Sequence, residues 1–127
     1  MALRLLIADD DPDDAWVIAF AMKRAGYAVE WQRVDDETGF CRELPGADLV
    51  ICDYSMPRFS PVRALEMIRD SGRATPLLLV SGSVSAEIAG RIVALGAAGT
   101  LGKDHLDRLG PAVRDALAGR AAGQREP

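Results

Sequence analysis

Cysteine, histidine and aromatic residues are scarce in this chain, long apolar runs and basic clusters are missing, and these features exclude several classes of function. The two cysteines, Cys41 and Cys52, have neither CxxC spacing nor a disulfide framework, which favours a reduced, cytoplasmic setting. No apolar run is long enough to cross a bilayer, and the N-terminus reaches Asp9 too soon for a secretory signal. The net charge is −4 and the basic residues are scattered, so we expect neither a nucleic-acid nor a membrane partner.

The length and composition are those of one ordinary globular domain. Of the 127 residues, 49% are apolar and 27% are charged, and a chain of this size buries roughly two thirds of its unfolded surface. No internal repeat or linker is visible in the sequence. We therefore expect one domain over residues 1–120 and a frayed C-terminal tail over residues 121–127.

Short apolar runs alternate with helical patterns about five times along the chain. This rhythm is typical of βαβ units and a parallel sheet, and predicts the α/β class. The runs are apolar at consecutive positions, as in central strands that are buried on both faces. The expected strands are Arg4–Ala8, Ala28–Arg33, Leu49–Cys52, Leu77–Val80 and Gly99–Leu101.

Capping residues mark the expected helices between these strands. Asp11-Pro12 and Ser60-Pro61 each combine an N-cap side chain with a proline at the first helical position. A short helix is expected over Glu37–Leu44, and apolar spacing predicts another around Ile88–Leu95. Pro111 either kinks the last helix or marks its start.

The environment of a few single side chains can also be predicted. Trp16 and Phe20 lie four residues apart on the first helix and are expected in the core. Trp31, on an edge strand, is either a partner contact or half-buried packing. Cys52 is expected to pack as a small buried hydrophobic residue, and His105 to be partly exposed and not a metal ligand.

A polar or charged side chain follows four of the expected strands, at the point where each strand ends. Asp9 and Asp10 follow the first strand, Asp53 the third, Ser81 the fourth and Lys103 the fifth. In an open parallel sheet, ligands bind outside the carboxyl ends of the strands. The sequence therefore predicts one small site that holds three carboxylates, a hydroxyl and an ammonium group.

The acidic part of this set suits a divalent cation. Mg²⁺ takes about six oxygen ligands, commonly one or two carboxylates together with waters and a phosphate oxygen. Asp10 and Asp53 suit direct ligation and Asp9 suits ligation through water, and Mn²⁺ is an alternative ion. Asp11 already caps the following helix, which leaves Asp9 and Asp10 without a capping role.

The same strand ends suit phosphoryl transfer. A carboxylate such as Asp53 can attack phosphorus to give an aspartyl phosphate, and this step needs mainly positioning and charge neutralisation. Lys103 supplies a positive charge for one phosphoryl oxygen, and Ser81 a hydroxyl donor for another. Gly82, next to Ser81, leaves space for an incoming phosphodonor.

In this order and strand context, the motifs resemble those of the receiver domains of two-component response regulators, the CheY-like family, over residues 3–118. Asp9-Asp10 resemble the acidic pair of the family, Asp53-Tyr54-Ser55-Met56-Pro57 its phosphoacceptor motif, and Ser81 and Lys103 its switch hydroxyl and its lysine. The resemblance implies a doubly wound (βα)5 flavodoxin-like three-layer sandwich with sheet order 2-1-3-4-5. It also implies that the backbone carbonyl of Ser55 joins the carboxylates as a metal ligand.

By the same resemblance, the chain is a phosphoacceptor switch and not an enzyme with a separate substrate. Its phosphoryl group would come from a sensor histidine kinase or a histidine phosphotransfer protein that docks near Asp14 and Val17. Phosphorylation would then switch a partner-binding surface. A monomer and a transient dimer through the last two helices are both compatible with the sequence, as are a stand-alone chain and a part of a larger protein.

Two positions depart from the pattern of the family. Thr100 stands where an aromatic relay residue is common, and Asp104 follows Lys103 where the family usually has a proline, often in a cis bond. A cis bond before Asp104 would cost roughly 2.5–4 kcal/mol, so we expect it to be trans. The segment from Gly102 to Val113 resembles receivers that are associated with sensory histidine kinases.

Three alternative functions fit the sequence less well. A phosphatase that uses an aspartyl phosphate resembles Asp-x-Asp at the nucleophile, and Asp53-Tyr54-Ser55 lacks the second acid. A pseudo-receiver keeps the fold without phosphorylation and has no need of the intact polar set. A flavodoxin-like cofactor binder needs a phosphate cradle after the first strand, where this chain is acidic.

Overall fold

The computed structural model describes residues 2–125, with the side chains described for residues 2–119. Its strands are β1 (Leu3–Ala8), β2 (Val29–Val34), β3 (Leu49–Cys52), β4 (Leu77–Ser81) and β5 (Gly99–Gly102). They form one parallel sheet in the order β2-β1-β3-β4-β5. The predicted α/β class and sheet order are therefore confirmed, and every strand boundary lies within one residue of its expected position.

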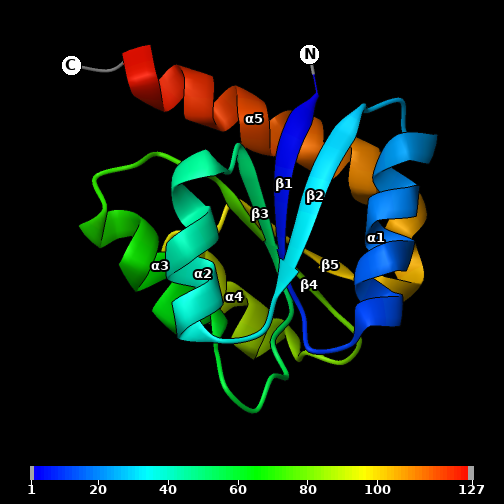
Figure 1. Ribbon diagram of the computed structural model, residues 1–127, viewed down its shortest axis with the longest axis horizontal. Helices are drawn as coiled ribbons and strands as arrows, with labels where there is room; N and C mark the ends of the chain where they lie inside the picture. Colours follow the sequence, from blue (N-terminus) through cyan, green and yellow to red (C-terminus); the bar gives the residue numbers. More distant parts are fainter. Residues whose placement is uncertain (1, 126–127) are drawn as a thin grey trace.

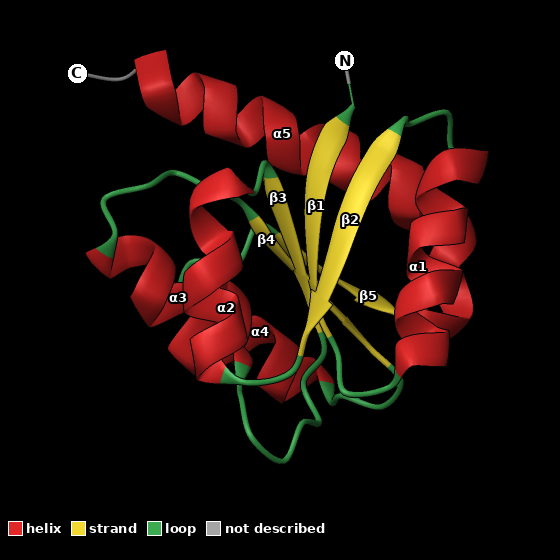
Figure 2. Cartoon of the chain, viewed as in Figure 1, coloured by secondary structure: helices red, strands yellow, loops and turns green. Residues whose placement is uncertain are grey.

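Helices cover both faces of the sheet and complete the doubly wound three-layer sandwich (Figure 1, Figure 2). The helices are α1 (Pro12–Arg24), α2 (Glu37–Glu43), α3 (Pro61–Asp70), α4 (Ala86–Ala94) and α5 (Leu109–Arg125). Helices α1 and α5 pack on one face, whereas α2, α3 and α4 pack on the other. Two 3-10 turns, η1 (Leu44–Gly46) and η2 (Lys103–Arg108), precede β3 and α5. No helix in the described part of the chain is both long and apolar enough to span a bilayer.

The helix starts follow the caps that the sequence predicts. The Asp11 side chain accepts hydrogen bonds from the amides of Asp13 and Asp14, and Ser60 Oγ accepts one from the Arg63 amide at 3.1 Å. Each cap satisfies amide groups that have no partner within the helix.

The last helix differs from the expectation at its C-terminal end. Pro111 stands in the first turn of α5, which begins at Leu109, so this proline marks the start of the helix and does not kink it. The helix then continues to Arg125, where a frayed tail was expected from Ala121 onwards. Residues 126–127 of that expected tail lie outside the described residues.

The core has one layer on each face of the sheet. Strands β3 and β4 are buried along their whole length and contribute to both layers. On the α2–α4 side, the Phe40 and Phe59 rings lie 4.9 Å apart. Trp31 is half-buried against the α1–α5 layer, which favours the packing alternative for this residue.

The expectation that Trp16 and Phe20 belong to the core is wrong. Their exposed fractions are 58% and 46%, and their rings stack on each other at 5.3 Å with an interplanar angle of 6°. The residues of α1 that face the sheet are smaller or aliphatic, namely Ala15, Ile18, Ala19 and Met22. Residues four apart on a helix share a face, and this pair shares the face that looks toward solvent.

Candidate functional site

The hydrogen bonding of the sheet continues for one residue beyond the carboxyl ends of β1 and β3, toward β2 and β1 respectively. The Asp53 amide donates to the Ala8 carbonyl at 2.8 Å, and the Asp9 amide donates to the Val34 carbonyl at 3.0 Å. These hydrogen bonds fix the backbone from which both acidic side chains project. The parallel register therefore brings together acids that are more than 40 residues apart in the sequence.

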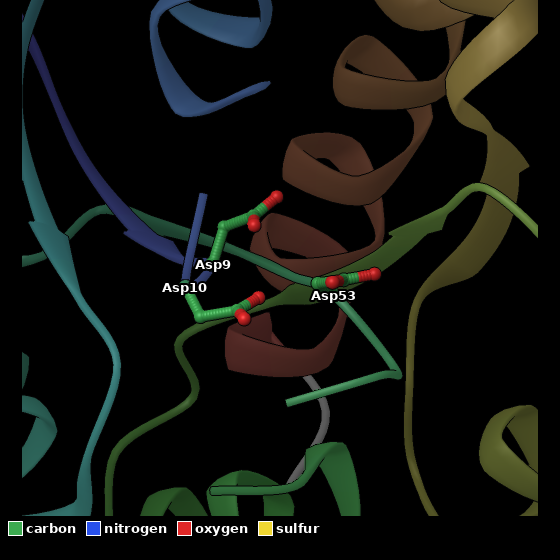
Figure 3. Close-up of side chains that lie close together, drawn as sticks. All are labelled: Asp9, Asp10 and Asp53. Carbon is green, nitrogen blue, oxygen red and sulfur yellow. The ribbon is translucent and has the colours of Figure 1, made fainter. Parts of the chain in front are cut away.

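Asp9, Asp10 and Asp53 form a compact acidic cluster at this edge of the sheet. One carboxylate oxygen from each residue lies within 4.8 Å of the others, and the three side chains project to the same side (Figure 3). Asp9 and Asp53 are buried, whereas Asp10 is exposed. An all-oxygen donor set with one side open to water fits a hard divalent cation that keeps part of its hydration shell.

The Asp53 carboxylate is oriented from both sides. Its Oδ1 accepts a hydrogen bond from the Tyr54 amide at 2.9 Å, and its Oδ2 lies 3.6 Å from Lys103 Nζ. Ser55 follows in the loop after β3 with an exposed side chain. The role of its carbonyl as a metal ligand stays a prediction.

Lys103 contacts three carboxylates at once. Its Nζ lies 2.8 Å from Asp14 Oδ2, 2.9 Å from Asp9 Oδ2 and 3.6 Å from Asp53 Oδ2. Burial lowers the pKa of Lys103, but the hydrogen bonds and charges of these carboxylates outweigh burial and raise the pKa above its ordinary value. Lys103 is therefore a permanent cation beside Asp53.

The Asp9 carboxylate is buried, and its surroundings compensate its charge only in part. Burial raises the pKa of its carboxyl, and the nearby charge of Asp53 raises it further. The Asp11 amide, which donates to Asp9 Oδ1 at 3.0 Å, and the Lys103 ammonium lower this pKa without cancelling the effect of burial. Within the described chain, Asp9 Oδ2 accepts no well-directed hydrogen bond and rests on the Lys103 contact. A cation bound to the cluster would relieve this imbalance.

Ser81 and Gly82 lie at the end of β4, beside an open cavity. Ser81 is 5% exposed, and a Cβ atom added to Gly82 would meet nothing within 4 Å. The cavity has a volume of about 320 Å³ and extends from Ser81 to Thr100 and Asp104. Thr100 is exposed and is one of the residues that line this cavity.

The backbone has an ordinary trans peptide bond before Asp104, one of the two positions that depart from the family pattern. All peptide bonds of the described residues are trans, so the expected trans bond between Lys103 and Asp104 is confirmed. His105 has an exposed side chain, as predicted, and its φ of −123° and ψ of 38° interrupt η2.

Two contacts of the site could not be predicted from the sequence. Asp14, expected only as a docking residue, is hydrogen-bonded to Lys103 at 2.8 Å, while its neighbour on α1, Val17, is 45% exposed. Arg33 Nη1 donates to the Asp9 carbonyl at 3.1 Å. No local motif predicts either contact, because the two residues of each pair are far apart in the sequence and come together only in the folded chain.

Comparison with known proteins defines the class of the chain. The family model of the response regulator receiver domain matches residues 5–114. The chain therefore belongs to this family, the CheY-like receiver domains of two-component systems. The chemotaxis protein CheY of Treponema pallidum is 30% identical over 97 residues, which cover 74% of this chain and 67% of that protein.

Longer response regulators and solved receiver structures agree with this class. The cell cycle transcriptional regulator CtrA of Caulobacter vibrioides is 27% identical over 81 residues, which are 64% of this chain but only 35% of CtrA. The signal receiver domain of the putative response regulator NarL from Mycobacterium tuberculosis superimposes with a TM-score of 0.79 at 25% identity, covering 93% of this chain and 98% of that one. A receiver domain of a putative Luxo repressor protein from Vibrio parahaemolyticus reaches 0.83 at 20% identity over 98% and 96% of the two chains, which shows the shared fold.

Proposed function

We propose that Asp53 accepts a phosphoryl group from a sensor histidine kinase or a histidine phosphotransfer protein, in a reaction that depends on Mg²⁺ or Mn²⁺. The convergence of the Asp53 carboxylate, the Lys103 ammonium 3.6 Å away and two further carboxylates carries this proposal. The chain then acts in the cytoplasm as a phosphoacceptor switch and not as an enzyme with a separate substrate.

Each residue of the site has a distinct part in the proposed transfer. A carboxylate oxygen of Asp53 attacks phosphorus, and the bond from phosphorus to the donor breaks, so that the donor leaves with the bonding electron pair. Lys103 neutralises charge on one phosphoryl oxygen, and the Ser81 hydroxyl donates to another. Gly82, where an added Cβ atom would meet nothing within 4 Å among the described residues, leaves room for the incoming phosphodonor.

The cation site of the proposal uses the acidic cluster. Asp9, Asp10, Asp53 and the carbonyl of Ser55 would hold the Mg²⁺ ion, which supplies positive charge to the phosphoryl oxygens when it is bound. We propose that the phosphodonor protein docks around Asp14 and Val17. Since Thr100 is too small to act as an aromatic relay, the switching surface should differ from the usual one.

Phosphoryl loading with a small donor tests the proposal. The protein is incubated with Mg²⁺ and acetyl phosphate, and its intact mass is measured. We expect wild type to gain one phosphoryl group, Asp53→Ala to gain none, and Asp107→Ala, an exposed control acid in η2, to behave as wild type. Equal loading of wild type and Asp53→Ala, or no loading of wild type, would refute the assignment.

A further inference from the structure

Three carboxylates share the single ammonium of Lys103, and they are not equally buried. The side chain of Asp9 is 1% exposed and that of Asp53 is 7% exposed, whereas that of Asp14 is 42% exposed. The contact to the exposed Asp14, at 2.8 Å, is nevertheless as close as the 2.9 Å contact to the buried Asp9, and both are shorter than the 3.6 Å contact to Asp53. The ammonium is therefore shared between a buried partner and a solvated one on α1.

We propose that Asp14 is a positioning residue for the phosphoryl site, which holds Lys103 on the α1 side until Asp53 is phosphorylated and then releases it. This inference rests on the proposed function and adds a residue and an exchange of partners to it. The exchange moves the Lys103 ammonium from the Asp14 carboxylate onto the phosphoryl group, while the contact with Asp9 is kept.

The balance of charge favours this exchange. A phosphoryl group carries a charge of about −1.5 to −2 near neutral pH and three strong acceptor oxygens, more than the single charge of the Asp53 carboxylate. A lysine ammonium is a compact charge on a flexible stem and can move toward the phosphoryl oxygens. Ion pairs at the surface contribute little to stability, so the exposed Asp14 pair is the easiest of the three to break.

Asp14 can also be left unpaired at low cost. It lies in the first turn of α1, where the helix dipole stabilises a negative charge and water reaches the carboxylate. Asp9 is buried, and loss of the ammonium would leave its Oδ2 with neither water nor a hydrogen-bond donor from the described chain. The contact that yields on phosphorylation is thus the one with Asp14.

The released carboxylate changes the surface of α1. Asp14 lies on the same helix as the exposed residues Trp16, Val17 and Phe20. Phosphorylation of Asp53 would therefore add an unpaired negative charge beside an apolar patch. This exchange gives the chain a route from Asp53 to its surface that needs no aromatic side chain at Thr100.

Loading of matched variants with acetyl phosphate and Mg²⁺ tests the inference. Asp14→Asn removes the competing carboxylate, and Asp13→Asn removes the same charge from the neighbouring exposed residue of that turn. We expect Asp14→Asn to load about two- to five-fold faster than Asp13→Asn, the range expected for loss of an exposed ion pair. Asp14→Glu, which keeps the pair, should load at the wild-type rate.

The Lys103 ammonium can be observed directly by ¹⁵N NMR. A merely structural effect of Asp14 would leave the chemical shift of this ammonium unchanged. We expect its signal in unphosphorylated Asp14→Asn to shift toward the position that it takes in the phosphorylated wild type. Equal loading of the two Asn variants, or slower loading of Asp14→Asn with an unchanged ammonium signal, overturns the role of Asp14 and leaves the proposed function intact. Wild type that gains no phosphoryl mass overturns both.

Discussion

Arg33 Nη1 donates a hydrogen bond to the backbone carbonyl of Asp9 at 3.1 Å, which ties the end of β2 to the acidic turn after β1. The same guanidinium group lies 3.6 Å from Asp35, and Asp35 pairs in turn with Arg58 at 3.0 Å. Arg58 belongs to the loop that follows Asp53. A chain of charged contacts on the surface therefore joins the two loops that carry the acidic cluster.

Removal of the Arg33 guanidinium should loosen this turn. We expect Arg33→Met to lower the free energy of unfolding by about 1 kcal/mol, because the Asp9 carbonyl loses a charged donor in a partly buried setting. Urea denaturation of the metal-free protein measures the change. Arg42→Met is the control, since Arg42 is 67% exposed and its one ion pair among the described residues is with its neighbour Glu43. Equal changes in the two variants would show that the contact with Asp9 contributes nothing specific.

The exposed aromatic pair on α1 leads to a second prediction about stability. Phe20 is 46% exposed and stacks on Trp16, whereas Phe40 is fully buried against Phe59. We expect Phe20→Ala to cost about 1 kcal/mol, the contribution of a ring pair at the surface. Phe40→Ala should cost about 3–5 kcal/mol because it leaves a cavity in the core. Thermal or urea unfolding compares the two identical substitutions, and similar losses would place Phe20 in the core after all.

The secondary structure and sheet order could be predicted from the sequence because their signals are local or apply to the whole family. Apolar runs such as Leu49–Cys52 define strands, and caps such as Asp11 and Ser60 fix where helices begin. The position of the acidic cluster follows from the same logic, since parallel strands end at one edge of the sheet.

The remaining features depend on which side of an element faces the core and on pairs that lie far apart in sequence. The spacing of Trp16 and Phe20 places them on one face of α1, but it does not say whether that face meets the sheet. The Lys103–Asp14 contact joins residues 89 positions apart, and neither residue has a neighbouring motif that indicates the other. Only the packing of α1 beside η2 brings them together.

The two cysteines should differ strongly in reactivity. Cys52 is buried, and burial together with the negative charges of Asp53 and Asp9 raises the pKa of its thiol far above the ordinary value. Cys41 is exposed on α2. We expect iodoacetamide to label one thiol of the native protein and both thiols in urea, as measured by intact mass. The Cys41→Ser variant should stay unlabelled until it unfolds, and labelling of native Cys41→Ser would show that Cys52 is accessible.

Asp9 should stabilise the proposed cation site at the expense of the metal-free fold. Because burial raises the pKa of the Asp9 carboxyl in the folded state, folding favours the protonated form, and stability is lost as the pH rises through that pKa. We therefore expect Asp9→Asn to raise the free energy of unfolding at neutral pH in the presence of EDTA, by about 0.5–2 kcal/mol. The gain should shrink toward acid pH, where Asp9 itself becomes protonated, and it should reverse when Mg²⁺ stabilises the wild type alone. Asp10→Asn, at an exposed position, should raise the free energy of unfolding less than Asp9→Asn does.

Urea denaturation from neutral to acid pH, with and without Mg²⁺, measures these effects. A gain that does not change with pH would show that the buried charge of Asp9 is not its origin.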